Sequence, residues 1–267
     1  MTIKNDLAGQ IHSRAKDASY LDARIAGNQK NQKTDLNQWI FDHLRVDPAS
    51  SVLELCAGTG AQSVKFLERL TSGSLTSTDA SGPALESIKE KAAAQKAADR
   101  LSVVQSDMDE LPAKLTGKKF NLIFCAYGLY YSKKADALLD GLLKTLRPDG
   151  RITIVGPFGP NNGALFSLLG KAGVNLPEYV TWTSRDFMPH LVLPWAGTHF
   201  TQCVLYTLQN EVVWKEADAL MTYWKNSTFF DAPREAAVQK LLDEHFAREK
   251  AFIDHKWVLY AEMRGMR

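Results

Sequence analysis

The chain has 267 residues, of which 45% are hydrophobic and 23% are charged, and its formal net charge at pH 7 is +2. This composition is typical of a soluble globular protein with room for one large α/β domain or two small ones. The near-neutral charge argues against binding to nucleic acid or an anionic membrane through the overall field. The start of the chain has no apolar signal core and no run reaches about 18 apolar residues, so a cytoplasmic protein without a spanning helix is expected.

The three cysteines, Cys56, Cys125 and Cys203, are far apart and odd in number. Their spacing predicts neither a disulfide framework nor a metal site. Buried free thiols are the expected state in a cytoplasmic protein.

Residues 1–33 are polar, which indicates a mobile or ligand-ordered lead segment. Within it Tyr20 and Arg24 are four residues apart and would share one face of a helix. A solvated helix without a ligand is the alternative interpretation. An amphipathic helix is predicted next, capped by Thr34, with apolar residues at helical spacing: Leu36, Trp39, Ile40 and Leu44.

Residues 52–60, Val-Leu-Glu-Leu-Cys-Ala-Gly-Thr-Gly, predict a buried strand that ends in a turn of small residues, with a helix directly after it. This is the opening of a nucleotide-binding α/β unit, in which glycine lets a ligand approach the backbone. Glu54 lies inside the strand, where a carboxylate is costly unless it finds hydrogen-bond donors. Taken alone the turn is a weak signal, because many tight strand–helix turns contain two glycines.

Strands then alternate with helices, which predicts right-handed βαβ units and a parallel sheet. The predicted strands are 52–55, 75–78, 101–105, 120–125 and 151–155, and the predicted helices among them are 61–70, 83–97 and 135–146. Later in the chain we expect helices at 164–172, 183–192, 215–225 and 233–252, and strands at 200–208 and 256–262. We find no internal repeat and no linker that clearly divides the chain.

Acidic residues lie at the ends of the first three predicted strands: Glu54, Asp79 and Asp107. In an open parallel sheet, ligands bind at the carboxyl ends of the strands. Asp79, about 20 residues beyond the glycine turn, suits a ribose diol. Asp107 suits an adenine amine, and Met108 beside it suits the ring face. Each acid alone could be a turn or cap residue, but their joint placement favours a nucleotide site.

With these residues the chain resembles a class I S-adenosylmethionine-dependent methyltransferase, of the group that includes the ubiquinone-biosynthesis and malonyl-carrier-protein methyltransferases. Residues 54–60 resemble the acid-x-Gly-x-Gly-x-Gly motif, with Cys56 in place of the first glycine. Asp79 matches the ribose-binding acid and residues 107–108 match the adenine site. Residues 120–127 resemble the fourth strand and its exit, and residues 143–151 resemble the turn into the fifth. The match is specific over residues 50–156 and loose afterwards.

The resemblance implies a Rossmann-like, seven-stranded, mostly parallel sheet with the last strand antiparallel. Helices would lie on both faces, and a helical cover would be inserted after the fifth strand. It further implies a lid at residues 1–33 and one methyltransferase domain at 34–267. The core of that domain would comprise 50–156, 200–208 and 256–263, and the cover would comprise 157–199 and 209–255.

The implied cofactor is S-adenosylmethionine, with S-adenosylhomocysteine as product, and the lid residue Tyr20 or Arg24 would reach its carboxylate. The tyrosines that follow the fourth strand and one tryptophan of the cover are candidates for the acceptor pocket, with simple packing as the alternative. No catalytic base is identified and no metal is expected. The residues assigned to the cofactor are Tyr20, Arg24, Glu54, Cys56, Ala57, Gly58, Thr59, Gly60, Asp79, Ala80, Asp107, Met108, Cys125 and Ala126, and those assigned to the acceptor are Tyr127, Tyr130, Tyr131 and Trp224.

The reaction implied by the resemblance is in-line methyl transfer to an oxygen, nitrogen or carbon atom of a small-molecule metabolite. The cover supports this because it is rich in aromatic residues and has no basic stripe. Neither nucleic acid nor membrane is an expected partner, and the protein would be a monomer or a homodimer.

Other functions were weighed against this one. A dehydrogenase would show Tyr-x-x-x-Lys or a pair of catalytic histidines, and neither is evident. A nucleic-acid methyltransferase would typically show Asn or Asp-Pro-Pro-aromatic where Cys125-Ala-Tyr-Gly128 stands. An arsenic methyltransferase would need several reactive cysteines. A nucleic-acid or protein methyltransferase and a cofactor-binding module without activity stay open as alternatives.

Overall fold

The computed structural model describes residues 18–267, apart from the side chains of residues 18–22 and 24. The chain divides into two compact units. The core unit comprises Leu36–Gly156, Met188–Tyr206 and Leu259–Arg267. The cover unit comprises Pro157–Phe187, Thr207–Val258 and the described residues 18–35. Residues 188–199 lie in the core unit.

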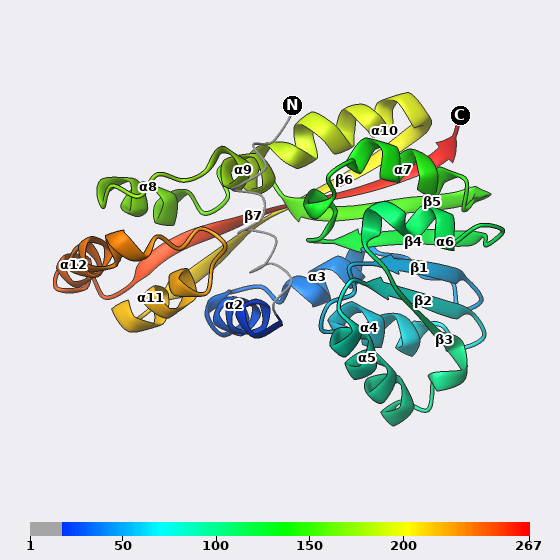
Figure 1. Ribbon diagram of the computed structural model, residues 1–267, viewed down its shortest axis with the longest axis horizontal. Helices are drawn as coiled ribbons and strands as arrows, with labels where there is room; N and C mark the ends of the chain where they lie inside the picture. The colour runs from blue at the N-terminus through cyan, green and yellow to red at the C-terminus, as the bar shows by residue number, and fades with distance from the viewer. Residues whose placement is uncertain (1–17) are drawn as a thin grey trace. The chain divides into compact units, whose positions relative to one another are not determined.

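Seven strands of the described chain form one mixed sheet with the order β3-β2-β1-β4-β5-β7-β6 (Figure 1). Strands β1 to β5 pair in parallel, as predicted. The strands are β1 (Ser51–Leu55), β2 (Ser74–Asp79), β3 (Leu101–Gln105), β4 (Phe120–Ala126), β5 (Leu146–Pro157), β6 (Phe200–Trp214) and β7 (Phe252–Met266).

Strand β7 lies between β5 and β6 and runs antiparallel to β6. The Thr201 hydroxyl donates to the Gly265 carbonyl at 3.1 Å, and further along β6 the Tyr206 ring lies 5.6 Å from the Tyr260 ring. Residue numbers therefore increase along β6 while those of the neighbouring residues on β7 decrease, so the two strands are antiparallel. The prediction of an antiparallel last strand is confirmed.

The helices of the core unit follow the predicted apolar spacing. Helix α5 starts after Ser81, whose hydroxyl accepts from the Ala84 amide at 3.4 Å, and it has a proline in its first turn. Figure 1 shows α4 and α5 together beside β1–β3, and α6 and α7 together beside β4 and β5. The core-unit helices are α3 (Leu36–His43), α4 (Ala61–Arg69), α5 (Gly82–Ala94), α6 (Leu111–Lys114), α7 (Ala135–Leu143) and α10 (Leu193–His199).

Two element boundaries differ from the predictions for a packing reason. The helix predicted at 135–146 ends at Leu143, and β5 begins already at Leu146. Leu146 is buried and pairs with Phe120, while the next register pair joins Leu122 to Arg151. Residues 148–150, where we predicted a turn before the strand, therefore lie inside β5 as an irregularity in its pairing. The strand starts early because the buried Leu146 already pairs with Phe120.

The cover unit contains helices together with the later part of β6, residues 207–214, and the first part of β7, residues 252–258. Asn210 on β6 binds the backbone of Thr34: its side chain accepts from the Thr34 amide at 3.0 Å and donates to the Thr34 carbonyl at 2.8 Å. Across the described residues no helix is long and apolar enough to cross a membrane. The cover-unit helices are α2 (Ala18–Asn31), α8 (Gly163–Lys171), α9 (Glu178–Thr181), α11 (Ala217–Lys225) and α12 (Glu235–Phe246).

Candidate functional site

The turn after β1 is built from left-handed backbone. Cys56, Gly58 and Gly60 have φ values of 55°, 52° and 78°. A Cβ atom at Gly60 would also lie 2.6 Å from the side chain of Ile88 on α5. Gly60 is therefore required both by its dihedral angle and by the close approach of α5. The result is a compact turn at the carboxyl end of β1, where a ligand can reach the backbone.

Asp79, at the end of β2, holds this turn in place. One of its carboxylate oxygens accepts from the Gly58 amide at 2.9 Å, and the other accepts from the Ser81 amide at 2.8 Å. A carboxylate oxygen has two lone pairs, so each can accept one further hydrogen bond. The arrangement fixes the carboxylate and suits it to two adjacent hydroxyl groups of a ligand.

Glu54 is a buried carboxylate of which only one oxygen accepts hydrogen bonds from the described residues. Its side chain is 1% exposed, and Oε2 accepts from the hydroxyls of Ser63 at 2.6 Å and Ser77 at 2.7 Å. Its other oxygen, Oε1, is buried and has no hydrogen-bond partner in the described part of the chain. Burial raises the pKa of Glu54 from 4.5 to about 7, although the two serine hydrogen bonds oppose the rise. Oε1 is thus an acceptor suited to a cationic or N–H group of a ligand.

Cys56 departs from glycine at a position that needs left-handed backbone, and Gly128 provides room for its side chain. A Cβ atom at Gly128 would lie 2.3 Å from the Cβ of Cys56, 2.5 Å from its Sγ and 3.6 Å from the Sγ of Cys125. Hydrogen bonding to Cys125, and then burial, raise the pKa of the Cys56 thiol well above its ordinary value. The Cys56 thiol is therefore held in its protonated form, and it packs against Cys125 between the ends of β1 and β4. All three cysteines are free, but the expectation that they are buried holds for Cys125, whereas Cys56 is half-buried and Cys203 on β6 is exposed.

Asp107 follows β3 and acts as a cap. Its carboxylate accepts from the Asp109 amide at 3.1 Å, at the start of the turn Met108–Glu110. The Ser106 amide donates to the Asp79 carbonyl at 3.0 Å, which joins the ends of β2 and β3. Ala57 in the glycine turn and Leu85 and Ile88 on α5 form an apolar cluster, against which Leu101 and Val103 of β3 also pack. The acids at the ends of β2 and β3 are thus brought together beside an apolar surface.

The tyrosines after β4 lie at the same edge of the sheet. Tyr127 has a φ of 57°, and its amide donates to the Val155 carbonyl of β5 at 2.9 Å. Tyr130 and Tyr131 are half-buried, with ring centroids 4.7 Å apart. Non-glycine residues in left-handed backbone cluster at functional sites, and Cys56 and Tyr127 are two of them at neighbouring strand ends.

The remaining predicted residues belong to the cover unit. Tyr20 and Arg24 lie in helix α2, and their side chains are outside the described residues. Trp224 is 1% exposed and packs on Phe230 at 4.9 Å, and its indole nitrogen has no hydrogen-bond partner among the described residues. Its neighbour Tyr223 accepts a hydrogen bond from the Lys256 ammonium at 2.7 Å.

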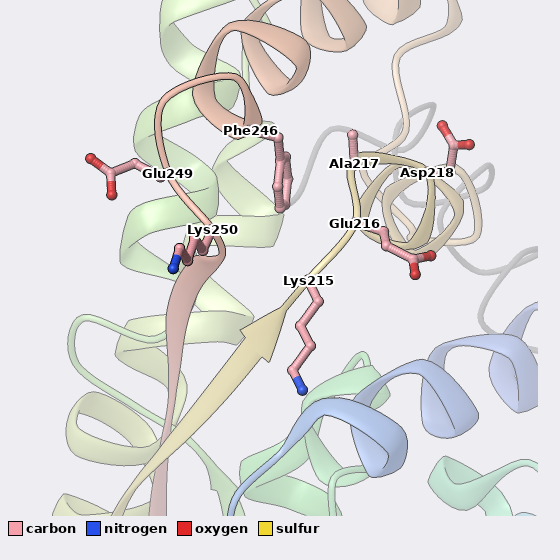
Figure 2. Close-up of a pocket in the computed structure, with 7 residues that line it drawn as sticks. All are labelled: Lys215, Glu216, Ala217, Asp218, Phe246, Glu249 and Lys250. Carbon is pink, nitrogen blue, oxygen red and sulfur yellow. The ribbon is translucent and has the colours of Figure 1, made fainter.

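A surface pocket of the cover unit shares none of the predicted site residues. Figure 2 shows the ring of Phe246 standing between the end of α12 and the start of α11, with charged side chains around it. Five of the seven lining residues are charged, two of them basic and three acidic. Its lining is Lys215, Glu216, Ala217, Asp218, Phe246, Glu249 and Lys250.

Sequence reasoning missed Ser63, Ser77 and Gly128. Ser63 lies on α4, nine residues after Glu54, and Ser77 lies on β2 opposite Glu54 in the parallel pairing. A buried acid predicts nearby hydroxyl donors, and pairing of the first two strands points to Ser77. Nothing in the sequence joins Gly128 to Cys56, because 72 positions separate them along the chain.

Comparison with known proteins points to one family. The profile of a methyltransferase domain matches residues 52–150. Demethylmenaquinone methyltransferase of Lactobacillus johnsonii is 28% identical over 210 residues, which are 70% of this chain and 84% of that protein. The ubiquinone/menaquinone biosynthesis C-methyltransferase UbiE of Ruegeria sp. is 28% identical over 43% of this chain and 46% of its own length. Apart from the Lactobacillus protein, the chain spans about half the length of the curated relatives that it matches.

Solved structures share the fold. The YcgJ protein of Bacillus subtilis superposes with a TM-score of 0.58 over 85% of this chain and 97% of that protein, at 14% identity. The matched profile covers the chain from β1 to the start of β5, which includes Glu54 on β1, Asp79 at the end of β2 and Asp107 after β3.

Proposed function

We propose, from the premise that this chain belongs to the class I S-adenosylmethionine-dependent methyltransferases, that it transfers a methyl group from S-adenosylmethionine to a small aromatic acceptor of the quinol type. The acceptor class is supported by the names of relatives, which include demethylmenaquinone and 2-phytyl-1,4-naphtoquinone methyltransferases. Methyl transfer to a ring carbon is the reaction class that the names of the UbiE relatives favour.

The observation that carries the proposal is the half-satisfied carboxylate of Glu54. A buried acceptor without a donor costs about 1–3 kcal/mol, so a ligand that supplies a donor gains that energy on binding. The amino group of the cofactor is such a donor, and its positive charge also favours the ionised carboxylate. The residues present therefore fit the cofactor on a criterion that does not depend on the motif.

The other strand ends would hold the rest of the cofactor. Asp79 would accept from the two ribose hydroxyls while it keeps its bonds to the turn. Asp107 and Met108 would contact adenine beside the apolar cluster of Ala57 and Ile88. The left-handed turn lets backbone amides lie against the ligand. In the cover unit, Tyr20 or Arg24 would contact the carboxylate.

When bound, the cofactor supplies an electrophilic methyl group on a positively charged sulfur. The chain must then orient the acceptor and exclude water, and neither task needs a metal ligand. Tyr127, Tyr130 and Tyr131 would form an aromatic wall for a planar acceptor at the exit of β4. The free state of all three cysteines supports our inference of a cytoplasmic location.

Two measurements test the function. Calorimetry should detect S-adenosylhomocysteine binding to the full chain, and a radiolabelled methyl donor should transfer its label to a demethylmenaquinone analogue with a short side chain. Binding without transfer to the quinol or to a panel of phenols and catechols would indicate a non-catalytic cofactor-binding module. Label that appears in RNA, DNA or protein instead would overturn the small-molecule proposal.

A further inference from the structure

One edge of the sheet is unusually open. β6 is the last strand in the sheet order, and in the core unit its residues Thr201–Tyr206 are all exposed, including Val204 at 36%, Leu205 at 46% and Tyr206 at 40%. Successive residues of a strand point to opposite faces, so both faces of this segment meet solvent. On the neighbouring strand β7, residues 259–263 are all buried. The Tyr206 ring packs against His43 on α3 at 4.3 Å, whereas the described chain leaves residues 202–205 in solvent.

The other edge strand of the sheet, β3, and the later part of β6 are both protected. Proteins commonly keep edge strands short, charged, interrupted by proline or covered. The opposite edge, β3, has five residues and exposes Ser102 and Gln105 alone. In the cover unit, the later part of β6 is bridged by Gln32 and Lys33, whose backbone pairs with Val212 and Glu211. Residues 201–206, Thr-Gln-Cys-Val-Leu-Tyr, contain no charged residue, proline or glycine.

We propose that residues 202–206 of β6 pair with the same residues of a second copy of this chain, antiparallel about a twofold axis near Val204. In such a pairing Val204 faces its own counterpart, Cys203 faces Leu205, and Gln202 faces Tyr206.

The charge pattern selects this occupant. About a twofold axis a charge at Val204 would face its own copy, and a charge at Cys203 or Leu205 would lie diagonal to its own copy. The segment carries none, whereas a strongly charged partner peptide would find no opposite charge on it. Valine, leucine and tyrosine are also favourable cross-strand neighbours.

The interface would be small. A ladder of five residues with its side chains lies at the lower end of specific interfaces, so the dimer should be reversible, with a dissociation constant roughly in the micromolar range. Association would extend the sheet of the core unit through β6 without using any residue assigned to the cofactor.

Sedimentation velocity of the full chain over a range of concentrations tests the pairing. The wild type should shift from the mass of one chain to that of two, and Val204→Lys should weaken this association at least about tenfold, because two lysines would face each other. Ile253→Lys is the matched control, since Ile253 is 48% exposed on β7 in the cover unit. It should associate as the wild type does.

A charge-swap experiment identifies the partner segment. Val204→Lys and Val204→Asp should each stay monomeric alone, and an equal mixture should recover the dimer. Circular dichroism and S-adenosylhomocysteine affinity of each variant should match the wild type, which excludes unfolding as the cause. A wild type that is monomeric at every concentration would overturn the proposal. So would a Val204→Lys variant that dimerises normally, or a mixture that fails to associate.

Discussion

Replacing Gly128 with alanine probes the packing that lets Cys56 stand in a glycine position. Gly128 has a φ of −132°, which any residue adopts, so alanine brings no backbone strain. Its new Cβ would nevertheless lie 2.3 Å and 2.5 Å from the Cβ and Sγ of Cys56. Neither group can retreat easily, because Cys56 belongs to the turn that Asp79 holds. We expect Gly128→Ala to lower the free energy of unfolding by about 2–3 kcal/mol, the upper range for overpacking.

Removing the thiol should reverse this cost. Cys56→Gly deletes both clashing atoms and relieves a left-handed conformation worth about 1 kcal/mol, while it leaves a small void. These effects nearly cancel, so the single variant should stay within about 1 kcal/mol of the wild type. In the double variant the alanine methyl occupies that void. The coupling free energy between the two substitutions should therefore be about 2 kcal/mol.

Urea unfolding of the wild type, both single variants and the double variant measures the coupling. The urea dependence of the unfolding free energy should stay constant across the set, so that midpoint shifts report stability. S-adenosylhomocysteine affinity should fall in Gly128→Ala and recover in the double variant, because the turn is displaced and then restored. Additive losses, with the double variant less stable than Gly128→Ala, would refute the packing argument.

The other predictions concern Glu54, Asp79, Trp224 and Tyr130. Because burial raises the pKa of Glu54 from 4.5 to about 7, its contribution to stability is full below pH 4.5 and is lost as the pH rises through 7. Glu54→Gln should therefore gain about 3 kcal/mol relative to the wild type over that window, measured by urea unfolding at each pH, and a constant difference would contradict the assignment. Asp79→Ala should weaken S-adenosylhomocysteine binding by about 1–3 kcal/mol in calorimetry, with Asp79→Asn intermediate, and unchanged affinity would exclude the ribose role. Trp224→Ala should lower the free energy of unfolding by about 3–5 kcal/mol, because Trp224 is only 1% exposed. Tyr130→Ala should instead fold normally and mainly reduce acceptor turnover. A stable Trp224→Ala protein that has lost turnover would place Trp224 in the acceptor pocket.

The sequence by itself determined the local structure around the site. The alternation of apolar strands with amphipathic helices predicted that β1 to β5 form a parallel sheet, because strands joined by helices pair in parallel. β3 spans Leu101–Gln105, as predicted, and Asp79 ends β2. The glycine turn and the acids at strand ends were also predictable, since parallel strands bring their carboxyl ends to one edge.

Tertiary structure alone decided the contacts between distant segments. Ser63 and Ser77 satisfy one oxygen of Glu54 and leave the other buried without a donor, which no periodicity reveals. Gly128 makes room for Cys56 across two strand ends, and Leu146 is drawn into β5 by its pairing with Phe120. The exposure of residues 201–206 on β6 likewise depends on how the other elements pack around that strand. Local patterns record the burial of a residue, whereas its partners are set by how separate elements pack in three dimensions.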